Sequence, residues 1–316
     1  MKEGDKMSKN ISQFPIGNLF SERQSLIVTR RDGANYYNKV LIPFAEYILN
    51  SQDTSDYKNV DSALMKKIHE NYYDNRGDLE ERHRIFWKNA SSLPRILPIV
   101  YFERVGSKEY LRITEVGKKH YEGKLTCKEF LLLWILRFQG SEYSDKGVLT
   151  KSKLSILSSC KHHSYRSLVE TRIVKPGILA LDVLKKAKEN GVDEITDKQF
   201  RNARKLLNQE DEQAVSDITQ MVISGESSDG SQENQIFNVL EYLGLCNVKS
   251  YQTNNYKFEI TGLGAELINK IKSLPFTYYH KTNMTSDFIE YYGGMPNKFE
   301  NEIMDYYRLN GGDFNV

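Results

Sequence analysis

Cysteine is scarce in this chain of 316 residues, and no apolar run is long enough to cross a bilayer. Cys127, Cys160 and Cys246 are odd in number and far apart, which excludes a disulfide framework and leaves no pair with zinc-ligand spacing. A membrane helix needs about 20 consecutive apolar residues, and the first residues lack the pattern of a secretion signal. We therefore expect reduced thiols, a cytoplasmic location and no membrane partner.

A strong overall charge is also absent, since the net charge is only +2, but the charges are unevenly distributed. From Lys146 to Lys175 there are seven Lys or Arg residues and a single acid, Glu170, so we expect this basic stretch to face phosphates. From Gln209 to Glu233 there are seven acids and no Lys or Arg, with linker composition at the end. We expect this acidic loop to face solvent, away from any polyanion.

Two stretches of the chain end in the same way, with a polar hairpin, a short alternating strand, Thr-x-x-Gly and an apolar-periodic helix. One copy ends in Tyr110–Gly117 and the other in Tyr256–Gly264. The hydroxyls of Thr114 and Thr261 can accept from the free amides of the helix that follows, so both are predicted N-caps. Turn residues divide each hairpin into strands, expected at 99–105 with 109–113 and at 248–251 with 256–260.

A hairpin followed by a helix is common in α/β proteins, but its recurrence with the same cap favours a winged helix-turn-helix module. Pro176 suits the first turn of a helix that Asn190-Gly191 ends, and a short turn leads from there into the next helix. The apolar periodicity predicts helices at 36–50, 63–73, 79–88, 114–122, 126–138, 176–189, 197–207, 234–243 and 263–273. The predicted fold class is mainly α with small β wings (α+β), arranged as tandem winged helix-turn-helix modules.

These boundaries suggest a modular chain, and its composition of 39% apolar and 27% charged residues is ordinary for a globular protein. A chain of this length can hold two or three domains. The expected parts are a flexible lead (1–12), a first winged-helix recognition subdomain (13–142), a basic connector (143–175), a second winged-helix subdomain with the acidic loop (176–275, loop 209–233) and a linker or C-terminal segment (276–316).

Several motifs then occur in a fixed order. The first subdomain carries Glu109 to Gly117, followed by Phe130-Leu131-Leu132-Leu133-Trp134 and Arg137-Phe138-Gln139. The second carries Leu184-Lys185-Lys186 in its first helix and Tyr242-Leu243-Gly244-Leu245 before its hairpin. The segment from Phe288 to Gly293 follows. Together they resemble the DNA-recognition region of the AlwI-like type IIS restriction and nicking endonucleases. The resemblance covers roughly Phe14 to Pro296 and extends more distantly to FokI-type enzymes.

This resemblance implies a protein that recognises a short asymmetric site in double-stranded DNA, with cleavage at a fixed distance by a Mg²⁺-dependent nuclease domain. The chain departs from the family because it has no Pro-Asp dipeptide, and the one clear Glu-x-Lys, Glu122-Gly123-Lys124, falls at an expected solvated helix end. His162-His163 has no Asn or His at a productive spacing. We therefore predict no catalytic or metal-binding residue here. The chain would be the recognition portion or specificity subunit that works with a nuclease domain or catalytic subunit.

Candidate DNA contacts are side chains that can read bases or hold phosphates. Arg and Lys suit guanine and phosphate, whereas Asn and Gln suit adenine. The candidates come from a polar N-terminal arm, the helix at 79–88, the turn before the first hairpin, the basic stretch and a predicted recognition helix at 197–207. An exposed loop or a solvated helix face explains the first two groups equally well. They are Asn18, Arg23, Arg30, Arg31, Arg82, Arg84, Lys88, Arg95, Lys161, His162, Arg166, Lys198, Gln199, Arg201, Asn202 and Lys205.

Two further classes of function stay open at the level of sequence. A non-enzymatic tandem winged-helix binder, such as a replication initiator or a transcriptional regulator, would usually dimerise on a palindrome, whereas a type IIS recognition region binds an asymmetric site as a monomer. A structural scaffold would bind no duplex even at low salt.

Overall fold

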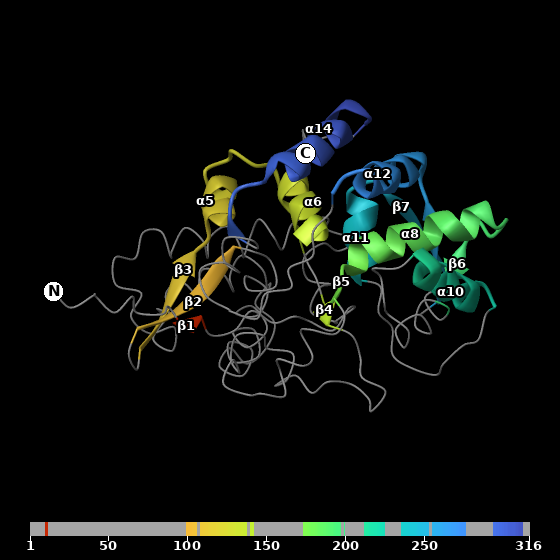
Figure 1. The fold of residues 1–316 in the computed structure, drawn as a ribbon, viewed down its shortest axis with the longest axis horizontal. Helices are drawn as coiled ribbons and strands as arrows, with labels where there is room; N and C mark the ends of the chain where they lie inside the picture. The colour runs from red at the N-terminus through yellow and green to blue at the C-terminus, as the bar shows by residue number, and fades with distance from the viewer. Residues whose placement is uncertain are drawn as a thin grey trace.

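The computed structural model describes residues 10–11, 99–105, 108–137, 140–141, 173–196, 199, 212–224, 235–252, 255–275 and 293–311. These ranges contain two hairpin units joined by a C-terminal helix (Figure 1). Among them, no helix combines the length and the apolar character that a bilayer crossing requires.

The first unit is a hairpin followed by two helices. β2 (Val100–Val105) and β3 (Lys108–Ile113) pair antiparallel, and α5 (Glu115–Tyr121) and α6 (Cys127–Arg137) follow. The predicted strands and helices are confirmed to within one residue at each end. β1 (Asn10–Ile11) pairs with β2, so the end of the lead expected at 1–12 takes part in this sheet, contrary to the prediction.

The Thr-x-x-Gly motif of the first unit connects the start of α5 to the residue just before β2. Thr114 caps α5 by accepting from the Gly117 amide at 2.9 Å, and its own amide donates to the Ile99 carbonyl oxygen at 2.9 Å. A Cβ on Gly117 would lie 2.5 Å from that same oxygen. Glycine is therefore needed because the Ile99 carbonyl, just before β2, approaches the helix too closely for any side chain.

The second unit repeats this closure after a longer helical segment. β7 (Cys246–Gln252) and β8 (Asn255–Ile260) form the hairpin, and Thr261 caps α12 (Gly262–Lys272) by accepting from the Gly264 amide at 3.0 Å. The Thr261 amide donates to the Leu245 carbonyl oxygen at 3.2 Å. Both predicted caps, Thr114 and Thr261, are confirmed.

Three further elements of the second unit precede its hairpin. α8 (Pro176–Glu189) begins at the predicted proline and ends at the predicted Asn190-Gly191, β6 (Ile195–Thr196) follows it, and α11 (Gln235–Tyr242) leads directly into the hairpin. The sheet order is β6-β8-β7, so the short strand between the helices pairs with the last strand of the hairpin. α8 packs against α10, α11 and α12 and forms the centre of the unit.

The acidic loop predicted at 209–233 is wrong for its first half. α10 (Glu212–Ile223) is a helix in which Val215, Thr219 and Val222 are buried, and it packs on α8. In the sequence of α10, Glu212 and Asp217 alternate with apolar residues that recur at helical spacing, which is the pattern of an amphipathic helix. Composition favoured a linker, but the burial of these apolar residues outweighs it.

The chain between the two units is tied at its ends by a small ribbon. β4 (Gly140–Ser141) pairs antiparallel with β5 (Ile173–Val174). The predicted basic connector therefore leaves and returns at neighbouring points. Its residues from 142 to 172 lie outside the described residues.

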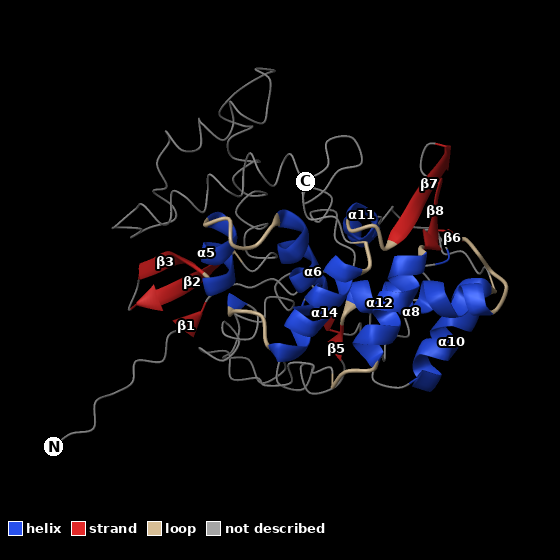
Figure 2. Cartoon of the chain, turned by 90° about the horizontal axis from the view of Figure 1, so that it is seen from above, coloured by secondary structure: helices blue, strands red, loops and turns tan. Residues whose placement is uncertain are grey.

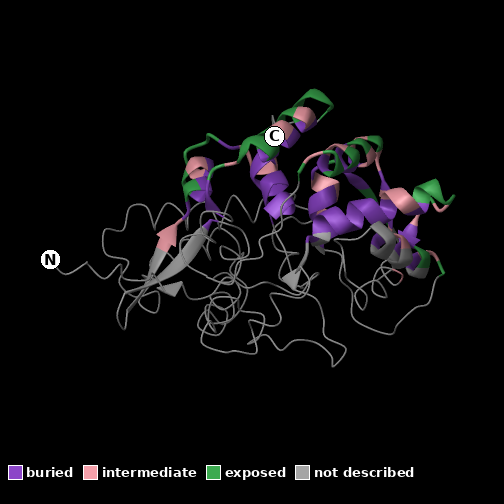
Figure 3. Ribbon diagram, viewed as in Figure 1, coloured by how far each residue is buried: buried purple, intermediate pink, exposed green. Residues whose placement is uncertain are grey.

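The C-terminal segment contains α14 (Lys298–Leu309), which packs on α6 of the first unit and α12 of the second. The two three-stranded sheets lie apart, with α6 and α14 between them (Figures 1 and 2). Figure 3 shows that α6 is buried, and its seven residues from Phe130 to Leu136 are each at most 1% exposed. A helix that is apolar on all sides belongs in a core, so α6 is the core of this junction.

Candidate nucleic-acid interface

The sheet of the second unit has one buried and one charged face. Side chains alternate along a strand, and Ile195, Val248 and Phe258 on the inner face are buried. The intervening residues, Lys249 of β7 with Lys257 and Glu259 of β8, lie on the outer face, together with Glu194 just before β6. The inner face packs in the core of the unit, whereas the outer face carries the charged side chains.

Two lysines of this outer face lie directly opposite each other. Lys249 and Lys257 are partners in the β7–β8 register, and Glu194 receives an ion pair from each, at 2.7 Å and 2.8 Å. Glu259 adds a second acid, 3.1 Å from the Lys249 ammonium. We refer to these four residues as the wing charge cluster.

Hydrogen bonding stabilises the charged forms of two members of this cluster. Hydrogen bonds from Lys249 and then Lys257 lower the pKa of Glu194 to about 2. The bonds that Lys249 donates to Glu194 and Glu259 raise its pKa above the ordinary value for lysine. Glu194 and Lys249 are therefore both fully charged at neutral pH.

Gln199 is the one predicted DNA-contacting residue within the described part of the chain. Its side-chain oxygen accepts from the Thr196 amide at 2.8 Å and from the Thr196 hydroxyl at 2.9 Å, while its own amide donates to that hydroxyl at 3.2 Å. This reciprocal arrangement is a capping box. In this conformation the oxygen is engaged in the cap, so a two-bond contact to adenine, which needs oxygen and nitrogen together, requires the cap to open.

Lys175, at the end of the basic stretch, does not face solvent. It is 1% exposed, and its ammonium donates to the Leu136 carbonyl oxygen at 2.6 Å. Burial lowers its pKa to about 7, against an opposing attraction from Glu300. The expectation of a phosphate-facing stretch is thus wrong for Lys175. A backbone carbonyl at the end of α6, which sequence does not reveal, provides its partner.

The remaining predicted contact residues lie outside the described residues, and their placement stays a prediction. The same holds for the helices expected at 36–50, 63–73 and 79–88, and for the helix at 197–207 apart from Gln199. The residues are Asn18, Arg23, Arg30, Arg31, Arg82, Arg84, Lys88, Arg95, Lys161, His162, Arg166, Lys198, Arg201, Asn202 and Lys205.

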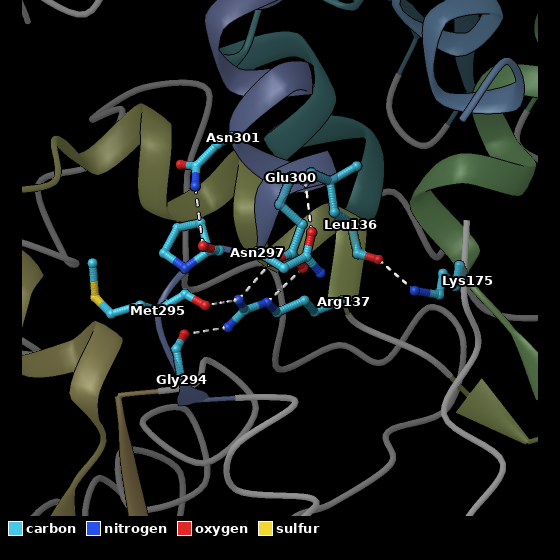
Figure 4. Close-up of polar contacts among 9 residues, drawn as sticks. Leu136, Arg137, Lys175, Gly294, Met295, Asn297, Glu300 and Asn301 are labelled. Carbon is cyan, nitrogen blue, oxygen red and sulfur yellow. Dashed lines mark hydrogen bonds and ion pairs between the residues drawn. The ribbon is translucent and has the colours of Figure 1, made fainter. Parts of the chain in front are cut away.

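A buried polar joint connects α6 of the first unit with the C-terminal segment, and sequence reasoning missed it. Arg137, at the end of α6, donates through Nε and Nη2 to the two carboxylate oxygens of Glu300 at 2.8 Å and 2.7 Å (Figure 4). The same guanidinium donates to the carbonyl oxygens of Gly294 and Met295 at 2.7 Å and 3.0 Å. With 2% of Arg137 exposed, the guanidinium is satisfied by a carboxylate and two carbonyls, as a buried charge must be.

Glu300 is held in place by the start of its own helix. It accepts from the Asn297 amide at 2.9 Å, while its amide donates to the Asn297 side-chain oxygen at 2.9 Å. The carboxylate therefore completes both a capping box and a two-bond contact with arginine. Asn-x-x-Glu before an apolar-periodic segment is a readable signal for a helix start, but composition favoured a linker there.

The opposite end of α14 binds both units as well. Tyr307 donates from its hydroxyl to the Leu243 carbonyl oxygen at 2.6 Å in the second unit, and Arg308 pairs with Glu129 of α6 in the first. Lys270 of α12 pairs with Glu302. α14 thus fixes the first closure relative to the second.

Among the described residues, no group of three His, Cys, Asp or Glu side chains is placed to hold a metal ion. Glu122 and Lys124 form an exposed ion pair of 2.7 Å at the end of α5, as expected for a solvated helix end. Burial raises the pKa of the Cys127 thiol to about 12, so it is a poor nucleophile at neutral pH.

Comparison with known families, curated proteins and solved structures found no match to this chain. The function therefore has to be inferred from the residues and their geometry.

Proposed function

We propose that this chain recognises a short asymmetric sequence in double-stranded DNA, as the binding portion or specificity subunit of a type IIS restriction or nicking endonuclease. The cut would be made by a metal-dependent nuclease domain or catalytic subunit that works with it. Base recognition would come from the helix predicted at 197–207, and phosphate contacts from the basic stretch and the wing.

The main support is the order of elements in the second unit. A helix, a short strand, further helices and a hairpin occur in sequence, and the short strand pairs with the last strand of the hairpin. This connectivity is typical of a winged helix-turn-helix module, and the proposal extends it to the first unit through the shared Thr-x-x-Gly closure. Fold alone does not define function, so the charged face of the sheet is the second support.

The observation that carries the proposal is the position of the Thr196 cap. Thr196 is the register partner of Lys257, and its hydroxyl accepts from the Gln199 amide. A recognition helix at 197–207, as predicted, would therefore begin beside the wing charge cluster. Base-reading and phosphate-binding side chains in one place are what a sequence-specific DNA interface needs.

The test is a selection of bound sequences from random duplex at a stated salt concentration, followed by a protection footprint. The expected result is one asymmetric site protected by one molecule. Symmetric half-sites would overturn the endonuclease assignment in favour of a dimeric regulator, and failure to bind any duplex at low salt would overturn DNA recognition altogether.

Two variants separate base contacts from phosphate contacts. Arg166→Ala should weaken binding to all sequences and reduce the salt dependence, with a slope smaller by about 0.9 for each phosphate that the variant no longer binds. Arg201→Ala should change the preferred base at one position and reduce the discrimination there by about 1–3 kcal/mol. Uniform weakening in both variants would show that the helix at 197–207 does not read bases.

A further inference from the structure

The hairpin of the second unit places two like charges opposite each other. Lys249 is the register partner of Lys257, and like charges directly opposite destabilise a hairpin. This hairpin therefore has to compensate for a repulsion between its strands.

Glu194 provides that compensation, with a geometry that resembles a phosphate. Each of its two carboxylate oxygens accepts from one ammonium, Oε1 from Lys249 at 2.7 Å and Oε2 from Lys257 at 2.8 Å. A phosphodiester likewise presents two anionic oxygens to neighbouring cations. The two lysines thus already hold one bidentate anion, the Glu194 carboxylate.

We propose that Lys249 and Lys257 are a phosphodiester site of the second hairpin, and that Glu194 occupies it in the free protein as an internal competitor. This inference rests on the proposed function. A DNA phosphate has to displace Glu194 before it reaches the lysines. Random duplex, which offers few favourable base contacts, leaves Glu194 in place, whereas the recognised sequence supplies the base contacts that drive the exchange.

The position of Glu194 in the chain fits this role. It lies two residues before Thr196, whose hydroxyl caps the predicted recognition helix through Gln199. The other three members of the wing charge cluster come from β7 and β8. Glu194 therefore lies where the wing and the helix start meet, and it acts against non-specific binding by repelling the wrong ligand.

The experiment compares Glu194→Gln with the wild-type chain on the selected sequence and on random duplex, across a salt series. The variant should bind random duplex on the order of tenfold more tightly. The slope of log K against log salt for random duplex should steepen by roughly 0.9, because one more phosphate is neutralised. Affinity for the selected sequence should rise less, so the ratio of specific to non-specific binding falls.

Glu189→Gln is the matched control. It removes the same charge from the second unit, but Glu189 pairs with Lys185 on α8 and not with the wing. This control should leave the affinity for random duplex nearly unchanged. An equal gain in Glu189→Gln and Glu194→Gln would reduce the effect to net charge and overturn the inference.

A second variant keeps the inference testable if Glu194→Gln folds poorly with its lysines unopposed. Lys249→Ala with Lys257→Ala removes the repulsion together with the site. It should weaken binding to the selected sequence with a slope smaller by roughly 0.9, because one phosphate contact is lost, and leave random duplex nearly unaffected. If the wild-type chain binds its selected sequence but this variant binds equally well, the inference fails and the proposed function stands. If the wild-type chain binds no duplex, the proposed function itself fails.

Discussion

The two hairpin units are closed by the same set of atoms but completed by different third strands. In both, a threonine caps the closing helix, and a glycine admits the carbonyl of the residue just before the hairpin, Ile99 in one and Leu245 in the other. In the first sheet β1 pairs with the first hairpin strand, whereas in the second β6 pairs with the last. The Thr-x-x-Gly closure depends only on residues close in sequence, so it can recur wherever this motif recurs. The third strand depends instead on the path of the chain before the hairpin.

The largest expected effect comes from breaking the joint that links the two closures. Arg137→Met should lower the free energy of unfolding by about 3–5 kcal/mol, because it leaves the Glu300 carboxylate buried without its partner. Urea denaturation, followed by signals from both units, measures the change. If the units then unfold in two separate steps, the joint is what makes them one cooperative body.

Two control variants, Glu300→Gln and Asp305→Asn, test whether this loss of stability comes from the buried ion pair. Glutamine keeps the oxygen that the Asn297 cap requires and removes the charge, so its cost isolates the ion pair. Asp305 forms an exposed pair with Arg308, its side chain being 62% exposed, and its replacement should cost less than about 1 kcal/mol. Equal costs for Arg137→Met and Asp305→Asn would contradict a structural role for the joint.

The next largest effect is expected from replacing the close-approach glycine of each closure, Gly117 or Gly264, with alanine. A Cβ on Gly117 would lie 2.5 Å from the Ile99 carbonyl oxygen, and one on Gly264 would lie still closer to that of Leu245. Both neighbours are backbone atoms, which cannot rotate away, so each Gly→Ala should cost about 1–3 kcal/mol or more, with Gly264 the larger. Thermal or urea denaturation of the two variants gives the order.

Gly262 provides the matched control because it stands at the start of the same helix with nothing near its missing Cβ. Gly262→Ala should be neutral, or stabilising by about 0.4–1 kcal/mol through the unfolded chain. A similar cost at Gly262 and Gly264 would mean that the approach of the Leu245 carbonyl is not the reason for glycine.

The last effect is a dependence on pH at the junction between the units. Lys175 has a folded-state pKa of about 7, against roughly 10.4 in an unfolded chain. Between these values the unfolded chain binds the proton more often, so stability rises with pH, by up to about 1.4 kcal/mol per unit. Glu300 and Arg137 act on this group with opposite signs. Lys175→Met should flatten the rise between pH 7 and pH 9, as measured by urea denaturation.

Lys188, exposed near the end of α8, is the control for this prediction. Lys188→Met should keep the rise in stability between pH 7 and pH 9. A wild-type chain whose stability falls over this interval would show that Lys175 is not buried as a lysine with a lowered pKa.

Sequence predicted what local chemistry determines. The hairpins, Thr114, Thr261 and the helix from Pro176 were identified because turns, caps and periodicity act over a few residues. The loop prediction for α10 is wrong because it rests on the acids of the whole stretch from Gln209 to Glu233, although Val215, Ile218 and Val222 have helical spacing. The helical spacing was readable in the sequence, but the acidic composition of the stretch was given more weight.

Other features had no local signal. Arg137 and Glu300 are 163 residues apart in the chain, and nothing near either one identifies the other. In the sequence Lys175 is one of a run of cations, but in the fold it is buried and donates to the Leu136 carbonyl oxygen. Glu194 likewise depends on two lysines more than fifty residues away. Such pairings depend on the packed fold, which a single sequence does not show.

The β4–β5 ribbon has a consequence for engineering. Because Gly140 pairs with Val174, the sequence between the two strands forms a cassette whose ends are already joined. It carries Lys161, His162 and Arg166, three of the predicted DNA contacts. Under the proposed function, exchange of this cassette would therefore change the affinity for DNA while the two closures are left intact.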